Sequence, residues 1–185
     1  GRWERDANGN LAPRPDYVRA LVLYRRLVEE FKKGETRYHD ECKQRIRDLT
    51  APSVSLQVER FFLPGSEAQY TLAWRNLERV ELELVPIDLT RDVSFAGDGN
   101  EDWLNRLALS QKPSARWTHD TKDPGKHEPG TAQLLLTSRP EAGAYVLHAS
   151  GGGKEARALL LVSDAAVTVK GSGSKLLAWA TDAKS

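Results

Sequence analysis

The histidines are the residues of this sequence best suited to acid–base or metal chemistry. His119-Asp120 and His127-Glu128 lie in the stretch PSARWTHDTKDPGKHEPG, whose prolines and glycines predict a polar loop between Pro113 and Gly130. The spacing H-x7-H differs from the zinc-binding pattern His-Glu-x-x-His, which puts both rings on one helix face. We therefore favour a solvated loop, with a hydrolase that uses His119, Asp120 and His127 as the less favoured alternative.

A second group of polar residues has part of the pattern of a calcium-binding loop. Asp98, Asn100 and Asp102 stand at its first, third and fifth positions. Such a loop also requires glycine at position six and a bidentate glutamate at position twelve. Trp103 and Leu109 occupy those positions instead. We therefore interpret Asp98 or Asn100 as the cap of a short helix, and its expected buried face consists of Trp103, Leu104 and Leu107.

Three further features could be mistaken for reaction centres. SGGGKEA, residues 150–156, lacks the Ser or Thr that follows Gly-Lys in a phosphate-binding loop, and a strand rather than a helix is expected after it, so it predicts a hairpin turn. Cys42 stands at an apolar position of a helical pattern, which favours a buried residue. His148 alternates with Tyr145 and Leu147, which predicts the outer face of its strand. We predict no enzyme and assign no catalytic, cofactor-binding or metal-binding residue.

The charge balance and the hydropathy exclude two classes of partner. The 27 Lys and Arg residues are almost cancelled by 26 Asp and Glu residues, so general attraction to nucleic acid is not expected. The longest apolar runs fall well short of the roughly 20 residues that a membrane helix needs, and we expect no membrane contact.

Residues 1–50 are predicted to form a helical hairpin. Apolar residues recur at helical spacing from Pro15 to Leu49, and Lys32-Lys33-Gly34 is typical of a helix end. The stretch ALVLYRRLVEEFKKGETRYHDECKQRIRDL loosely resembles a tetratricopeptide-type repeat. Because a lone repeat does not form a solenoid, we expect either the last unit of a helical array or a hairpin that docks on the following residues.

From Ser53 the apolar residues alternate, which is the pattern of half-buried strands. SVSLQVERFF, AQYTLAWRN and RVELELVPIDL predict three successive strands of one antiparallel sheet with one wet face. Strand patterns return in TAQLLLTS, GAYVLHAS, EARALLLVSD, AAVTVK and KLLAWATD. We predict a mainly β fold: an antiparallel β-sandwich of macroglobulin or immunoglobulin type, with the N-terminal αα-hairpin and a short helical insertion.

Two stretches resemble macroglobulin-like domains of the bacterial alpha-2-macroglobulin family. SVSLQVERFFLPGSEAQYTLAWRNLERVELELVPIDL contains a strand, a Pro-Gly turn and an RNL step between the next two strands. PEAGAYVLHASGGGKEARALLLVSDAAVTVKGSGSKLLAWATDA contains Gly143-Ala144-Tyr145 where the family has Gly-x-Tyr, and an LLVSD strand ending at Asp164. The resemblance implies a macroglobulin-like domain at residues 53–164, and at residues 165–185 either the first strands of a following domain or an extra hairpin.

The family consists of large chains of stacked β-sandwich domains that restrain proteases. This sequence starts at Gly1 and is interpreted as part of such a chain, with neighbouring domains as its partners, proteases bound only through the intact parent, and a periplasmic or cell-surface location. The family's thioester motif, Cys-x-Glu-Gln, has no counterpart, because Cys42 is followed by Lys43-Gln44-Arg45. The resemblance therefore implies a non-catalytic structural module and transfers no functional residue.

The alternative hypothesis is an immunoglobulin-like module that binds a protein or a glycan. A glycan platform would need at least two exposed, coplanar tryptophans, and the candidates are Trp74, Trp103, Trp117 and Trp179. Their positions in alternating strands or beside a helix favour the core instead. If Trp74 is in the core, its replacement by alanine is expected to cost about 3–5 kcal/mol.

Overall fold

A computed structural model describes residues 2–5, 9–59, 61–93 and 103–182. The chain is mainly β, with several antiparallel sheets and a smaller helical part. The elements are β1 (Arg2–Arg5), β2 (Leu11–Arg14), α1 (Tyr17–Glu30), α2 (His39–Thr50), β3 (Ser53–Val58), β4 (Phe61–Phe62), β5 (Gln69–Arg75), β6 (Arg79–Ile87), α3 (Trp103–Arg106), β7 (Ala115–Asp120), β8 (Gly130–Leu135), β9 (Gly143–Gly151), β10 (Lys154–Val162), β11 (Ala165–Ser172) and β12 (Lys175–Asp182).

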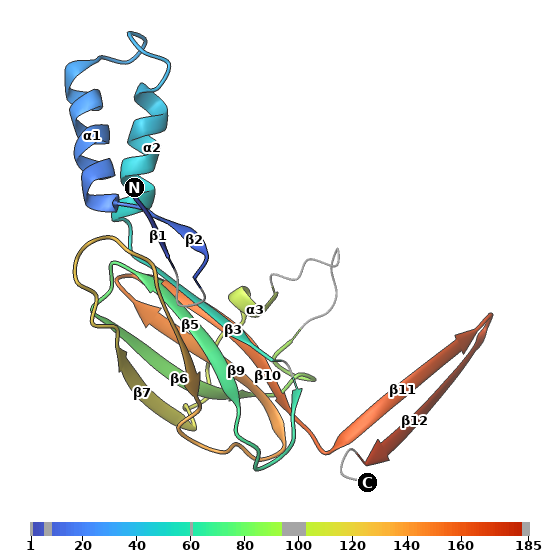
Figure 1. The fold of residues 1–185 in the computed structure, drawn as a ribbon. Coiled ribbons are helices and arrows are strands. Elements are labelled where there is room, and N and C mark those ends of the chain that lie inside the picture. Colours follow the sequence, from blue (N-terminus) through green and yellow to red (C-terminus); the bar gives the residue numbers. More distant parts are fainter. Residues whose placement is uncertain (1, 6–8, 60, 94–102, 183–185) are drawn as a thin grey trace.

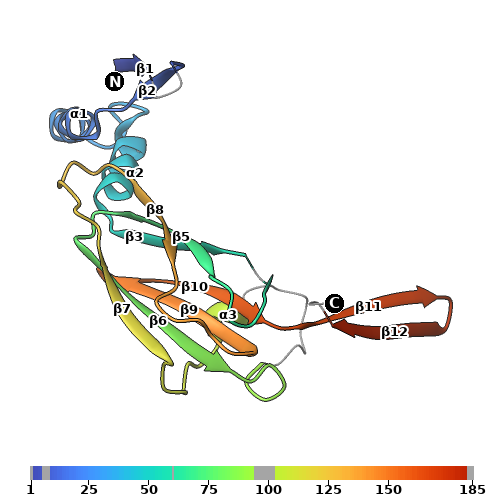
Figure 2. The same ribbon diagram turned by 60° about the horizontal axis from the view of Figure 1, so that its bottom comes forward.

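Two sheets form the centre of the molecule. One contains three strands in the order β3-β5-β8, and the other contains five in the order β4-β10-β9-β6-β7. All neighbours are antiparallel except β4 and β10, which run parallel over two residue pairs. Figure 2 shows the two sheets as separate layers, with α1 and α2 at one end and the β11–β12 hairpin at the other.

The eight strands expected from the sequence are present, but β6 lies in a different sheet from the one predicted. β3 pairs with β5 as expected, whereas β6 pairs with β7 and β9 in the opposite layer. The prediction of one sheet from three successive strands was therefore wrong. The chain changes layers at the turn between Arg75 and Arg79, where Asn76 adopts a left-handed conformation with φ 54°. β1, β2 and β7 were not predicted, and the predicted strand SVSLQVERFF contains two separate strands, β3 and β4.

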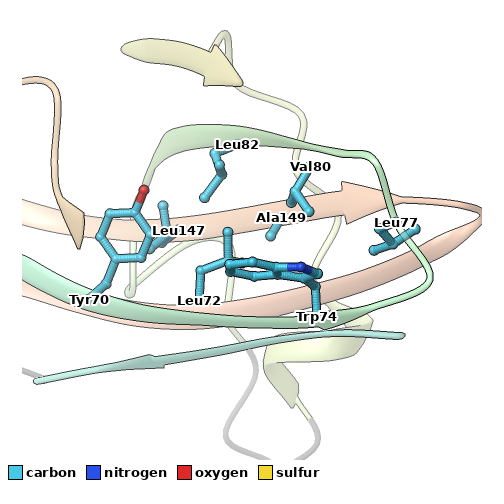
Figure 3. Packing of buried hydrophobic residues seen from close by; sticks show 8 residues of the cluster. All are labelled: Tyr70, Leu72, Trp74, Leu77, Val80, Leu82, Leu147 and Ala149. Atoms are coloured by element: carbon cyan, nitrogen blue, oxygen red, sulfur yellow. The ribbon is translucent and has the colours of Figure 1, made fainter. Parts of the chain in front are cut away.

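The main core lies between the two sheets, and Figure 3 shows its buried side chains. Three residues of β5 pack against residues of β6 and β9 in the other layer, as well as Leu77 of the connecting turn; the cluster comprises Tyr70, Leu72, Trp74, Leu77, Val80, Leu82, Leu147 and Ala149. The predicted core position of Trp74 is confirmed, because the residue is only 8% exposed. Gly130 leaves the space that the indole fills, since a Cβ there would lie 2.4 Å from Trp74 Cε2.

The outer face of the five-stranded sheet is partly covered. Val85 and Val146 pair on this face, opposite the core, and both are almost completely buried. α3 lies against β10, and Arg157 of β10 donates hydrogen bonds from Nη1 to the carbonyl oxygens of Leu104, Asn105 and Leu107 at 3.3, 3.2 and 2.7 Å. The last carbonyl groups of a helix have no partners within the helix. Arg157 supplies partners for those of α3 and so holds α3 on the sheet.

The short helix was predicted correctly in position but not in detail. α3 has a single turn, Leu107 directly after it is buried, and Trp103 and Leu104 are half-buried. The proposed caps Asp98 and Asn100, like Asp102 of the calcium-type pattern, lie outside the described residues.

The helical hairpin matches the predicted region, with a β-hairpin in front of it. Asp16 caps α1 by accepting a hydrogen bond from the Arg19 amide at 2.9 Å. α1 ends at Glu30, before the predicted basic end, and Gly34 has a φ of 94° in the connecting turn. Cys42 is 6% exposed, as predicted. The unpredicted strands β1 and β2 pair with each other across residues 2–14.

Candidate interaction surfaces

His119 belongs to a strand, so the prediction of one polar loop from Pro113 to Gly130 was wrong. It lies in β7, which covers Ala115–Asp120 and pairs with β6, and residue 119 is opposite Val80. The His119 ring is tilted against the Trp74 indole, with 5.2 Å between the ring centroids. It therefore packs at the margin of the core, which does not suit a metal ligand held in a loop.

His127 has a different partner and lies in the remaining loop, residues 121–129. Its Nδ1 lies 2.7 Å from Oδ1 of Asn76, and its backbone has a φ of 60°. Among the described residues no three His, Cys, Asp or Glu side chains are grouped as a metal site would require. The structure thus gives His119 and His127 separate partners instead of joining them with Asp120 into one centre.

His148 lies on the outer face of β9, as predicted, but it is not solvated. Its side chain is 15% exposed and stands between Arg157 of β10 and Glu83 of β6 in the strand register. Its Nε2 is 3.4 Å from Oε2 of Glu155, and the Glu83 carboxylate forms an ion pair of 2.7 Å with Arg116. These residues form a row of ionisable side chains across four strands on the side that α3 partly covers.

The glycine-rich stretch is a hairpin turn, as predicted. β9 ends at Gly151 and β10 begins at Lys154, and the two turn residues Gly152 and Gly153 have φ values of 56° and 71°. Two successive positive φ angles are typical of a type I′ turn, which favours glycine at both positions.

Asn76 joins the helical hairpin to the two sheets. Its Nδ2 donates hydrogen bonds to the carbonyl oxygens of Leu49 and Ala51, at 2.8 and 2.9 Å, where α2 ends. Its Oδ1 faces His127, so one side chain connects the end of α2, the β5–β6 turn and the 121–129 loop. The Thr121 hydroxyl, which donates to the Leu77 carbonyl, fixes the start of the same loop. Sequence patterns did not indicate this role, although asparagine is one of the few residues that readily adopt a left-handed conformation.

The junction also contains a cation–π contact and a cleft. The Arg75 guanidinium carbon lies 5.1 Å from the ring centre of Tyr17, the first residue of α1. An open cleft of about 470 Å³ lies beside this contact, lined by residues of α1, α2 and β5 that include Tyr24, Asp48 and Arg75. The helical hairpin therefore touches the sheets through polar groups with solvent space beside them, and among the described residues none of α1 or α2 belongs to the core clusters of the sheets.

The β11–β12 hairpin is the most exposed apolar element of the described chain. Figure 1 shows it projecting away from the sheets. Every residue of both strands is exposed, although the hairpin contains large apolar side chains: Val167, Val169, Leu176, Leu177 and Trp179. A two-stranded hairpin without a further layer is at best marginally stable in water. Its composition therefore indicates a contact surface.

The strand register divides this hairpin into two faces of different character. The valine face consists of Ala165, Val167, Val169, Gly171, Leu176, Ala178, Ala180 and Asp182. The lysine face consists of Ala166, Thr168, Lys170, Ser172, Lys175, Leu177, Trp179 and Thr181. From residue 167 to residue 180 the valine face carries no charge, whereas the lysine face carries both lysines.

Three of the four candidate tryptophans do not form the platform that a glycan-binding module would need, and the fourth, Trp103, is half-buried in α3. Trp74 is buried, and Trp117 is half-buried, with its Nε1 donating a hydrogen bond of 3.0 Å to the Tyr70 hydroxyl. Trp179, which is 41% exposed, lies in the remote hairpin. The described structure therefore does not present these three rings together on one surface.

Comparison with known proteins gives distant structural likeness only. No family model and no curated protein matches the chain. The CARDB domain of a Pyrococcus furiosus protein, in complex with di-metal ions, aligns with a TM-score of 0.36 and 11% identity over 61% of this chain and 88% of that one. BslA, a bacterial hydrophobin, aligns with a TM-score of 0.32 and 17% identity over 60% of this chain and 98% of that one. The sulfur carrier protein SoxY from Chlorobium limicola f thiosulfatophilum aligns with a TM-score of 0.26 and 12% identity over 60% of this chain and 78% of that one. TM-scores this low support no inference about function.

Among the described helices, none combines the length and the apolar character needed to cross a lipid bilayer.

Proposed function

We propose that this chain is a non-catalytic structural module whose two appendages contact neighbouring protein. The observation that carries the proposal is the β11–β12 hairpin, whose large apolar side chains are exposed while the two central sheets share a closed core. Folded proteins rarely leave such residues together in water unless they serve a contact. The helical hairpin adds a second attachment at the opposite end of the sheets (Figure 2).

More specifically, we propose a β-sandwich module of an alpha-2-macroglobulin-like protease-inhibitor protein, in the periplasm or at the cell surface. The main support is the order of the sequence motifs, and the strand boundaries agree with it. Leu63-Pro64-Gly65 is a turn in which the Ser66 amide donates to the Leu63 carbonyl at 3.1 Å. Asn76 of the RNL step is the connecting residue described above.

The second stretch of the resemblance also coincides with strand boundaries. β9 starts at Gly143 of the Gly-x-Tyr step, and the Tyr145 hydroxyl donates a hydrogen bond of 3.1 Å to the Glu141 carbonyl. The LLVSD stretch ends β10, whose last residue is Val162. Residues 165–185 would then be the start of a following domain or an extra hairpin, which agrees with the exposure of β11 and β12.

The test is digestion of a large protein substrate by trypsin, alone, with this chain, and with a longer parent chain that contains it. Protection by the parent and none by this chain would support a module that acts only within its assembly. A small peptide substrate is the control, because steric restraint leaves it accessible whereas a direct inhibitor blocks its cleavage as well.

Two outcomes would contradict the proposal. If the parent gives no protection, the protease-inhibitor part fails. If this chain alone blocks trypsin, it is a direct inhibitor. The first surface to mutate is then the 121–129 loop, because it is the part of the predicted loop between Pro113 and Gly130 that follows β7.

A further inference from the structure

The valine face of the β11–β12 hairpin has a regular steric profile. Its cross-strand pairs combine a large with a small residue: Val167 opposite Ala180, and Val169 opposite Ala178. The two valines lie on β11 and the two alanines on β12, so the face has a ridge along one strand and a hollow along the other. A third pair, Gly171 opposite Leu176, is reversed, but Leu176 leans over its own glycine, since a Cβ on Gly171 would lie 3.8 Å from Leu176 Cδ1.

Such a profile fits a copy of itself. A two-fold axis parallel to the strands, placed between two stacked hairpins, puts β11 of one copy over β12 of the other at the same height. Val167 and Val169 of each copy would then lie over Ala180 and Ala178 of the second copy. Large residues opposite small ones are the arrangement by which facing sheets interdigitate. An antiparallel stacking would instead oppose valine to valine.

We propose that the valine face binds the valine face of a second copy of this chain, with both hairpins pointing in the same direction. The charge distribution supports this face and this partner. The valine face is uncharged between Val167 and Ala180, so stacking this part of it desolvates no ion, while Lys170 and Lys175 on the opposite face stay in water. Stacking the lysine faces would bring four ammonium groups together. The proposal does not depend on protease restraint.

The size of the face sets the expected strength. Each strand spans about 25 Å at 3.3 Å per residue, and two neighbouring strands are about 5 Å apart. Two such faces cover less than the roughly 1,200 Å² of a stable interface, so the dimer is expected to be weak and concentration-dependent. We expect association between about 0.01 and 1 mM protein, the weak end of the affinity scale.

Sedimentation of the whole chain over this concentration range tests the association. The weight-average sedimentation coefficient of the unchanged protein is expected to rise toward that of a dimer. Val169→Lys should abolish the rise, because two ammonium groups would enter the apolar layer. Thr168→Lys is the matched control: it adds the same charge one residue earlier, on the lysine face, and should leave the rise intact.

The orientation is tested with a spin label at the hairpin tip. Ser174→Cys places the label in the turn, and Cys42→Ser removes the buried native thiol from the labelling reaction. Parallel stacking predicts a tip-to-tip separation within about 20 Å, given sheets packed roughly 10 Å apart. Antiparallel stacking predicts about 25 Å or more.

Three results would overturn the proposal. The first is a monomer at 1 mM, which would leave the face to a different β-domain. The second is equal loss of association in Val169→Lys and Thr168→Lys, and the third is the long tip-to-tip distance. Circular dichroism of each variant verifies that the central sheets are still folded. We expect them to be, because the hairpin's main contacts are between its own two strands.

Discussion

At the residue scale, Tyr70 shows how one side chain contributes both apolar and polar contacts to the core. Its ring is 2% exposed and lies edge to face with Trp117, with 6.3 Å between the centroids. Its hydroxyl accepts the Trp117 Nε1 hydrogen bond at 3.0 Å. Burial raises the pKa of Tyr70 above its ordinary value of 10.0, and the hydrogen bond from Trp117 partly opposes this, because it favours the phenolate.

Replacement of Tyr70 by phenylalanine is expected to lower the free energy of unfolding by about 1–2 kcal/mol at neutral pH. The change leaves the half-buried Trp117 N–H without its partner, and an unsatisfied donor costs about this much. Urea unfolding followed by tryptophan fluorescence measures the difference. A variant as stable as the unchanged protein would mean that water satisfies the indole.

The same pair of proteins gives a pH dependence with a definite sign. Because the folded-state pKa of Tyr70 is raised, its stabilising contribution is complete below about pH 10 and is lost as the pH rises through the folded-state value. The stability advantage over Tyr70→Phe should therefore shrink above pH 10. Thermal melting from pH 8 to pH 11 tests this, and a constant difference would argue against a raised pKa.

At the element scale, the junction at Asn76 connects two parts that the sequence presents as separate. Hydrophobic periodicity predicted the helices and the long strands well, because each buries one regular face. It missed β7, an edge strand whose side chains Arg116, Thr118 and Asp120 are exposed, so that its polar composition looked like a loop. It also misplaced β6, because the choice of sheet depends on distant pairing with β9 and not on the local pattern.

Asn76→Gly and Asn76→Ala separate the two contributions of the junction residue. Glycine retains the positive φ and removes the amide, so a loss of about 1–2 kcal/mol is expected from three hydrogen bonds that are partly exposed. Alanine should cost about 1 kcal/mol more, because it also disfavours the left-handed conformation. Chemical denaturation measures both values.

Limited proteolysis of the same variants reports on the junction itself. Cleavage between Leu49 and Ser53 should be faster in both variants, because the end of α2 loses its contact with the β5–β6 turn. Unchanged cleavage would mean that the Arg75–Tyr17 contact alone holds the helices.

At the scale of the whole molecule, the chain divides into a well-packed centre and two appendages whose contacts lie mainly within each appendage. The sequence was sufficient to predict the helical hairpin, most strands of the centre and the start of the last hairpin near Ala165. It could not predict the Asn76 contacts, because their acceptors at Leu49 and Ala51 come from an element whose docking is tertiary. The two faces of the hairpin follow from the register of its strands. Alternation of apolar and polar residues predicts that register only if the two turn residues are identified correctly.

Removal of residues 165–185 is expected to change the free energy of unfolding of the central sheets by less than about 0.5 kcal/mol, a typical limit for sites outside the core. The physical reason is that β11 and β12 find their main contacts in each other. Denaturant unfolding measures the value at a protein concentration too low for association. Truncation after Leu159 is the contrasting control, because it removes Leu160 and Val162 from the core and should unfold the sheets.

The strand register also determines the order in which the chain can fold. β5 pairs Gln69 with Leu135, and β6 pairs Glu81 with Ser150, so the central sheets need contacts between residues far apart in the sequence. The β11–β12 pairs are local by comparison. Since distant contacts slow folding, the apolar hairpin can form while the centre is still open. A newly made chain would then present its valine face before its own core has closed, at the stage when chance encounters with other unfinished chains are most damaging.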